Sequence, residues 1–147
     1  MAKAFHFRLD RLLALRRQKA EVAQRDLAAA MQLVQDQNRK LLEMMAEQDE
    51  GKAALRALRM RELDLVRLQF QEDYLGALER RIRGEVDRLQ EIVRAEVGKR
   101  RELTEAVRGV KVLERLRERR FRDWSREENR REGKVLDEVA QRMERAV

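Results

Sequence analysis

Proline is absent from all 147 residues of this chain. At the usual share of ~5%, a chain of this length would carry about seven prolines. Proline removes a backbone hydrogen-bond donor and clashes with the preceding helical turn, so its absence favours long, uninterrupted helices. The abundant Ala, Leu, Glu, Arg, Lys and Gln are good helix formers. We therefore predict an all-α rod, which would offer no deep pocket.

The composition suits a narrow helix-to-helix seam better than a compact globular core. Aromatic residues make up 4% of the chain and charged residues 43%. The apolar residues are mostly Leu, Val, Ala and Met, which suit a seam, while the charges suit the solvent-facing sides of the helices. High charge is also typical of disorder. The regular spacing of the apolar residues argues against that alternative.

The chain is basic, with 35 Lys and Arg against 28 Asp and Glu and a formal net charge of +7. Such a charge would attract nucleic acid, anionic lipid or an acidic protein face. Because the two signs are interleaved, the charges can also form an ordinary solvated helix surface laced with salt bridges. Both interpretations remain open at this point.

A seam with strict spacings of three and four runs through the first part of the chain. Nine of its twelve positions are apolar, which a disordered segment would not produce. The spacing is the heptad repeat that keeps one stripe of a helix facing a partner helix. The two Gln positions cost stability and can help to fix the register. The seam consists of Ala20, Ala23, Leu27, Ala30, Val34, Gln37, Leu41, Met44, Gln48, Gly51, Leu55 and Leu58.

A second periodic run has spacings that vary between three, four and six, so its seam is expected to drift around the helix. It consists of Leu75, Leu78, Ile82, Val86, Leu89, Val93, Val97, Leu103, Val107, Val110, Leu113, Leu116 and Phe121. Each glycine costs roughly 1 kcal/mol relative to Ala in a helix interior, so we expect the second helix to be the more pliable. Close approach to the first helix is the alternative role for these glycines. They are Gly76, Gly84, Gly98, Gly109 and Gly133.

The chain is predicted to reverse at about residues 58–66, where Asp64 is a candidate N-cap for the second helix. The predicted fold is an antiparallel two-helix coiled-coil hairpin with a longer second helix, in a single domain of residues 1–147. Its helices cover about residues 5–57 and 67–145, with residue i opposite roughly residue 126 minus i.

This hairpin would bring Phe5 and Phe7 close to Phe121 and Trp124, at the end where the termini meet. The second helix would outrun the first, leaving about twenty residues after Trp124 without a partner, or ~30 Å at 1.5 Å per residue. An unpaired helix end is a natural docking element.

The chain is poor in the residues that carry chemistry. It contains one His, one Ser, one Thr and no Cys, so a nucleophile, a base and an orienting group cannot be assembled in the usual ways. His6 has no second His or Cys to complete a metal site, and no Gly-Lys pair has the upstream Gly of a P-loop. We therefore expect no enzyme, no cofactor and no metal. The lack of a signal core or a membrane-spanning run predicts a soluble cytoplasmic protein.

The densest basic stretch covers residues 115–134 and includes Phe121 and Trp124. Arginines on phosphates with a stacking aromatic would suit nucleic acid. The acids recur every few residues and would repel a phosphate backbone, so an acidic protein face or a plain solvated surface are the alternatives.

Two segments at the ends of the chain resemble the FliJ family of flagellar export proteins. The first is Phe5-x-Phe7-Arg8-Leu9-x-x-Leu12-Leu13-x-Leu15-Arg16-Arg17, leading to Glu21. The second is Leu113-Glu114-Arg115-Leu116, followed by Arg126-Glu127-Glu128 through Glu132 and by Leu136-Asp137-Glu138. The chain length and the two-run layout also agree with this family.

The resemblance implies a non-enzymatic stalk of the flagellar type III export apparatus, similar to the central stalk of rotary ATPases and needed for flagellum biogenesis, motility and chemotaxis. Its implied partners are the hexameric export ATPase, the cytoplasmic domain of the export-gate protein and the export chaperones, with no specific nucleic acid. The implied location is the cytoplasm, peripheral at the inner face of the cell membrane through the gate. An injectisome stalk, or a basic coiled-coil scaffold that binds nucleic acid, are the alternatives.

The resemblance also implies two contact regions. The ATPase contact would comprise Phe5, Phe7, Arg8, Phe121, Arg122, Trp124, Arg130, Glu132, Asp137 and Glu138. The gate contact would comprise Tyr74, Leu75, Leu78 and Arg81, a patch with helical spacing that suits a groove on another protein. Simple packing in the seam is the alternative for Tyr74 and Leu78.

Overall fold

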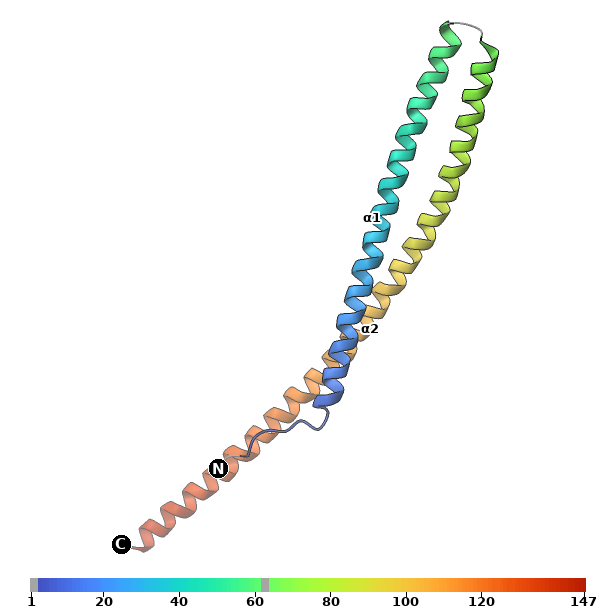
Figure 1. Cartoon of the computed structure of the whole chain (residues 1–147). Coiled ribbons are helices and arrows are strands. Elements are labelled where there is room, and N and C mark those ends of the chain that lie inside the picture. The colour runs from blue at the N-terminus through green and yellow to red at the C-terminus, as the bar shows by residue number, and fades with distance from the viewer. Residues whose placement is uncertain (1–2, 62–63) are drawn as a thin grey trace. The chain divides into compact units, whose positions relative to one another are not determined.

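The computed structural model describes residues 3–61 and 64–147 and contains two α-helices, α1 (Asp10–Arg61) and α2 (Leu65–Arg145), as Figure 1 shows. Contacts between them are those of an antiparallel hairpin with a longer second helix, as predicted. The chain divides into two compact units. The terminal unit is Met1–Val22 with Thr104–Val147, and the hairpin unit is Ala23–Leu103. The single domain predicted for residues 1–147 remains a prediction.

Helix α1 begins five residues later than predicted, at Asp10. The amide of Asp10 donates to the carbonyl of Phe7 at 3.2 Å, and the amide of Leu13 donates to the carbonyl of Leu9 at 2.9 Å, which closes the first turn. An acid in the first turn also complements the positive end of the helix dipole. Residues 3–9 are not helical, and Phe7 is buried among them.

The predicted reversal at residues 58–66 is shorter than expected, because α1 continues to Arg61 and α2 begins at Leu65. Within the predicted range, Glu62 and Leu63 lie outside the described residues. Asp64 is the N-cap that the sequence predicts: its carboxylate accepts hydrogen bonds from the amides of Val66 at 3.2 Å and Arg67 at 3.4 Å. The end of α2 at Arg145 agrees with the prediction.

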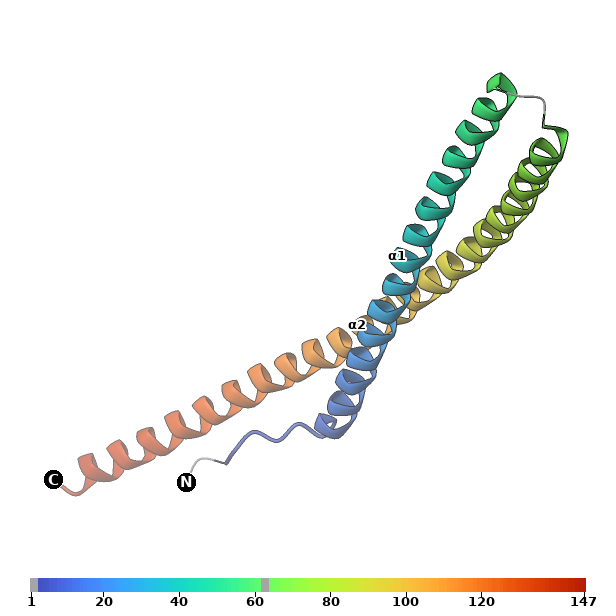
Figure 2. The same cartoon turned by 45° about the horizontal axis from the view of Figure 1, so that its top comes forward.

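In the hairpin unit, α1 and α2 lie side by side in both views (Figures 1 and 2). The seam predicted on α1 is confirmed over its whole length, from Ala20 to Leu58, because all twelve of its positions are buried or half-buried. Every other residue from Ala20 to Arg61 is exposed. The salt bridge Lys40–Glu85 and the contact of Leu75 with Gly51 lie close to the predicted pairing of residue i with residue 126 minus i.

The seam predicted for α2 is confirmed at ten of its thirteen positions, which are buried or half-buried, and is wrong at Val93, Val97 and Phe121, which are exposed. The predicted drift is also wrong, because a series of buried and half-buried residues with strict spacings of three and four can be followed along this helix. Several members of this series are polar or small. Further half-buried residues lie beside it: Gly76, Val86, Gly98, Val107 and Gly109. The observed seam is Leu68, Gln71, Leu75, Leu78, Ile82, Glu85, Leu89, Ile92, Glu96, Lys99, Leu103, Ala106, Val110 and Leu113. Both helices therefore keep the 3.5-residue period of coiled coils.

A buried polar contact holds the two helices together next to the apolar cluster. Gln37 is 7% exposed, and its side-chain amide donates to the backbone carbonyl of Glu85 at 3.0 Å and also to the Glu85 carboxylate. Lys40 donates to the same carboxylate at 2.8 Å. A polar group that is satisfied only in one register favours that register over its alternatives. This agrees with the role predicted for the Gln positions.

These contacts predict a pH dependence of stability. The hydrogen bonds from Lys40 and then from Gln37 hold the pKa of Glu85 below its ordinary value of 4.5. A lowered pKa means that the charged carboxylate stabilises the fold fully above the unfolded-state pKa and loses this effect as the pH falls through the folded-state pKa. We expect Glu85→Gln to lower the urea midpoint at pH 7, and the difference from the parent protein to shrink below about pH 4. A difference that stays constant over this range would contradict the assignment.

Replacing glycine with alanine is expected to change the stability differently at two positions. A Cβ on Gly51 would lie 2.6 Å from Cδ2 of Leu75, whereas a Cβ on Gly84 would meet nothing within 4 Å. We expect Gly84→Ala to raise the free energy of unfolding by about 1 kcal/mol. Gly51→Ala should give no such gain, because Leu75 packs against this site in the seam. Chemical unfolding measures both values, and equal gains would show that Leu75 moves aside freely.

Candidate functional site

An aromatic cluster forms in the terminal unit where the N-terminal segment meets α2. The centroid of the Phe5 ring lies 5.3 Å from the centroid of the Phe121 ring, with the two rings edge to face. It lies 5.8 Å from the centroid of the Trp124 ring. Phe121 and Trp124 are themselves 5.8 Å apart, and the guanidinium of Arg117 lies 5.6 Å from the centre of the Phe5 ring. The predicted meeting of Phe5 with Phe121 and Trp124 is confirmed. Phe121 remains exposed and Trp124 half-exposed, so the cluster presents aromatic surface to solvent.

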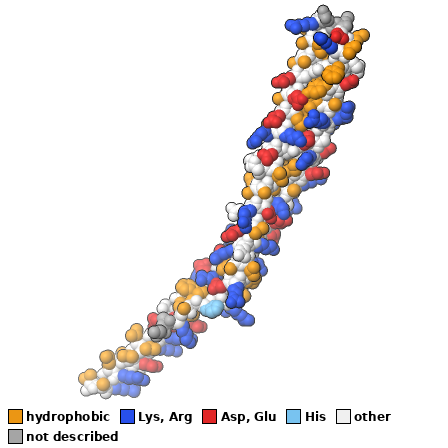
Figure 3. Space-filling model, viewed as in Figure 1, with side chains coloured by type: hydrophobic (Ala, Val, Ile, Leu, Met, Phe, Trp, Pro, Cys, Tyr) orange, Lys and Arg blue, Asp and Glu red, His pale blue; other side chains and the backbone are white. Residues whose placement is uncertain are grey.

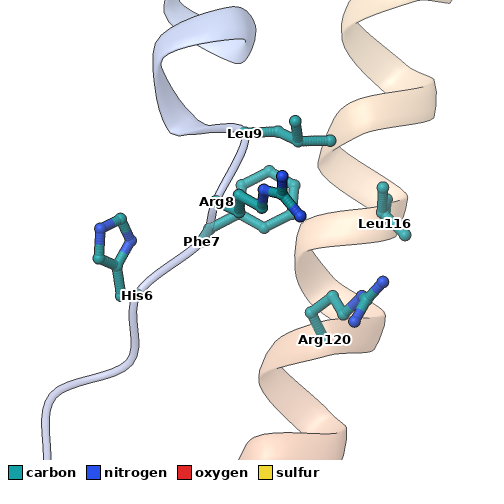
Figure 4. A pocket seen from close by; sticks show the side chains of 6 residues that line it. All are labelled: His6, Phe7, Arg8, Leu9, Leu116 and Arg120. Carbon is teal, nitrogen blue, oxygen red and sulfur yellow. The ribbon is translucent and has the colours of Figure 1, made fainter.

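Phe7 has a different role from Phe5, because it is buried and anchors the N-terminal segment to α2. In Figure 4, Phe7 and Leu9 point toward α2 beside Leu116, whereas His6 points away from it. These residues line a shallow hollow of about 380 Å³ together with Arg8 and Arg120. The hollow therefore has an apolar floor and a basic rim.

Two ion pairs join α1 to α2 in the terminal unit. Nε of Arg117 lies 3.3 Å from Oδ1 of Asp10, and a terminal guanidinium nitrogen of Arg17 lies 3.2 Å from Oε1 of Glu114. Exposed pairs of this kind contribute little to stability, typically 0–1 kcal/mol. Their value here is geometric: the pair of Asp10 with Arg117 agrees with the pairing of residue i with residue 126 minus i to within one residue, whereas Glu114 lies five residues beyond the position predicted opposite Arg17.

The basic stretch of residues 115–134 has a surface of mixed sign. Arg117 pairs with an acid of the other helix, while Arg122 pairs with Glu118 at 2.5 Å and Arg131 with Glu128 at 3.3 Å along α2. Acids placed among the arginines would repel a nucleic-acid backbone. The arrangement suits a charged protein face better, where such groups chiefly set partner choice and the rate of association.

The last turns of α2 carry an apolar face that the sequence analysis missed. Every residue from Lys134 to Val147 is exposed, including several large apolar side chains. Their spacings of one, three and four place them on one side of the helix, and most of the charged residues lie on the other side. Figure 3 shows this separation at the C-terminal end. We call this set the C-terminal face: Val135, Leu136, Val139 and Met143.

The residues predicted to contact an ATPase all belong to the terminal unit. Phe5, Phe121 and Trp124 come together, whereas Phe7 and Arg8 line the neighbouring hollow. The remaining charged residues are exposed along α2 and lie beside the cluster or toward its C-terminal end, in part around the C-terminal face. They are Arg122, Arg130, Glu132, Asp137 and Glu138.

The second predicted patch, in the hairpin unit, divides into a buried and an exposed half. Leu78 is 2% exposed and Leu75 packs against Gly51, so both take part in the seam. Tyr74 and Arg81 remain exposed. Tyr74 donates a hydrogen bond to Glu47, which raises the pKa of the phenol above its ordinary value of 10.0. Seam packing, the alternative considered for Leu78, is therefore confirmed for that residue but not for Tyr74.

Among the described residues, no helix combines the length and the apolar character needed to cross a membrane. Over the same part of the chain, no three His, Cys, Asp or Glu side chains are grouped so that they could hold a metal ion.

A family model described as flagellar FliJ protein matches residues 5–146. Comparisons with curated proteins and with solved structures gave no significant match. The matched range covers both helices, the aromatic cluster and the C-terminal face. The chain therefore belongs to the FliJ family, whose members are non-catalytic components of the flagellar protein export apparatus.

Proposed function

We propose that this protein is a non-enzymatic stalk that binds the hexameric export ATPase through its terminal unit and promotes assembly and activity of the hexamer. It would also contact the export-gate protein and the export chaperones, and would lie in the cytoplasm at the inner face of the membrane through the gate. Membership of the FliJ family supports the export role, and the surface of the terminal unit supports the proposed ATPase contact.

One observation carries the ATPase contact: apolar surface is left exposed on the terminal unit. The aromatic cluster presents Phe121 and Trp124 to solvent, and the C-terminal face is exposed over its whole length. Aromatic side chains and Arg are the residues that most often dominate binding energy at protein interfaces. Trp124 with Arg117 and Arg122 nearby has this composition, and the mixed charges around it would select the partner.

The proposed mechanism follows from symmetry. A two-helix hairpin has no rotational symmetry, so it must contact the subunits of a hexamer differently. A ligand that binds one conformation of a subunit better than another shifts that subunit toward the favoured conformation. The stalk can thereby bias the nucleotide states of the ATPase subunits without binding nucleotide itself.

The gate contact would use the exposed members of the patch near the start of α2. Tyr74 and Arg81 are available to a partner, whereas Leu78 is not. The hydrogen bond from Tyr74 to Glu47 ties the phenol to α1, which pre-organises it for binding.

Co-elution of the full chain with the export ATPase of its own organism tests the proposal. We expect the two proteins to elute as a complex in size-exclusion chromatography. High salt should dissociate only part of this complex, because apolar contacts persist when charges are screened. Separate elution, with the helical content of the chain confirmed by circular dichroism, would contradict the proposal.

A further inference from the structure

Three large apolar side chains stand exposed where α2 begins in the hairpin unit. Leu65, Val66 and Phe70 are 73%, 79% and 75% exposed. Together with Gln69 and Asp73 they line one shallow hollow of about 410 Å³, so they form a continuous surface. We call them the apolar tip. None of its three residues belongs to the seam or to the predicted gate patch.

Four arginines occupy the end of α1 and the start of α2, in the same turns of the hairpin as the apolar tip. Arg56, Arg59 and Arg61 lie in the last two turns of α1, and Arg67 lies in the first turn of α2. All four are exposed, although Arg59 pairs with Glu72 at 3.0 Å and Arg67 with Asp64 at 3.4 Å. Figure 3 shows hydrophobic and basic side chains next to one another at this end.

We propose that the apolar tip binds the surface of an anionic lipid bilayer. Leu65, Val66 and Phe70 would enter the boundary between headgroups and acyl chains, and the arginines would contact lipid phosphates. Exposed Phe and Leu beside clustered Lys or Arg is the pattern by which peripheral proteins bind membrane interfaces. Each cation near an anionic surface strengthens such binding roughly fivefold.

The extent of the apolar tip favours a lipid surface over a groove on another protein. A helix that binds in a groove carries apolar anchors at i, i+3, i+4 and i+7. Here the position seven residues after Val66 is Asp73, and the exposed residues four and seven after Phe70 are Tyr74 and the small Ala77. Tyr74 is only 38% exposed, and its hydroxyl is hydrogen-bonded to Glu47 of α1. The large apolar side chains of α2 that are more than 70% exposed are therefore grouped at the start of the helix, which suits shallow insertion. This inference does not depend on the proposed contacts with the ATPase or the gate.

Co-sedimentation of the full chain with vesicles tests the proposal. We expect binding to vesicles of phosphatidylglycerol and phosphatidylcholine at about 150 mM salt, and little binding to phosphatidylcholine alone. The double variant Val66→Ser/Phe70→Ser should bind at least about tenfold more weakly, because it removes the inserted apolar area. The matched control Leu33→Ser/Leu42→Ser, at exposed positions of α1 outside the apolar tip, should bind like the parent protein.

A second measurement reports insertion directly. In a Trp124→Phe background, Phe70→Trp should shift its emission to the blue on anionic vesicles and show no shift on neutral ones. The proposal is overturned by absence of binding to anionic vesicles, by an equal loss in the control variant, or by binding without a spectral shift. The first of these results would leave a protein partner as the alternative occupant of the apolar tip.

Discussion

Replacing Leu78 with alanine is expected to lower the free energy of unfolding by about 3 kcal/mol, the largest stability effect of any single truncation in the hairpin unit. Leu78 is 2% exposed and packs in one cluster with Leu41, Met44 and Ile82. A two-helix fold has little other apolar surface to compensate for the cavity. Urea unfolding followed by circular dichroism measures the loss.

Leu42→Ala provides the matched control for this prediction. Leu42 follows Leu41 directly but is 68% exposed, so its truncation should change the free energy of unfolding by less than about 0.5 kcal/mol. Similar losses at the two positions would show that the seam is not where the spacing of three and four places it.

Replacing the C-terminal face is expected to abolish most of the affinity for the export ATPase while leaving the fold intact. The variant Leu136→Ser/Val139→Ser/Met143→Ser removes three exposed apolar side chains from a helix segment in which every residue is exposed. Each would lose about 1–2 kcal/mol if it is buried in the complex, so we expect binding at least about a hundredfold weaker. Isothermal titration against the purified ATPase measures the change.

The control for this variant is Val112→Ser, also an exposed apolar residue of α2 in the terminal unit but away from the C-terminal face. It should bind the ATPase like the parent protein. Equal affinity for all three proteins would remove the C-terminal face from the interface, and loss of helical content in the triple variant would show that the face has a structural role.

The fold could be predicted from the sequence where apolar residues occupy the seam. On α1 they do so almost throughout, and the only interruptions are two Gln and one Gly. On α2 the seam includes Glu85, Glu96 and Lys99, whose long side chains can lie along apolar surface with their charged ends near solvent. Their inclusion depends on partners such as Lys40 of the other helix, which the sequence of α2 alone does not reveal.

The candidate site was predictable to the extent that it follows from helix pairing. Once residue i faces roughly residue 126 minus i, Phe5 must lie near Phe121. The C-terminal face was not predicted, although the spacing of four between Val135, Val139 and Met143 indicates it. The burial of Phe7 could not be predicted, because it depends on a non-helical segment that packs against α2.

The most direct test of the central claim is the turnover of the export ATPase at an enzyme concentration low enough for the hexamer to dissociate. Adding the full chain should raise both hexamer formation and ATP hydrolysis. The variant Phe5→Ala/Trp124→Ala, which removes the centre of the aromatic cluster, should raise neither. If the folded parent protein leaves hexamer formation and hydrolysis unchanged, it does not act as a stalk for the export ATPase.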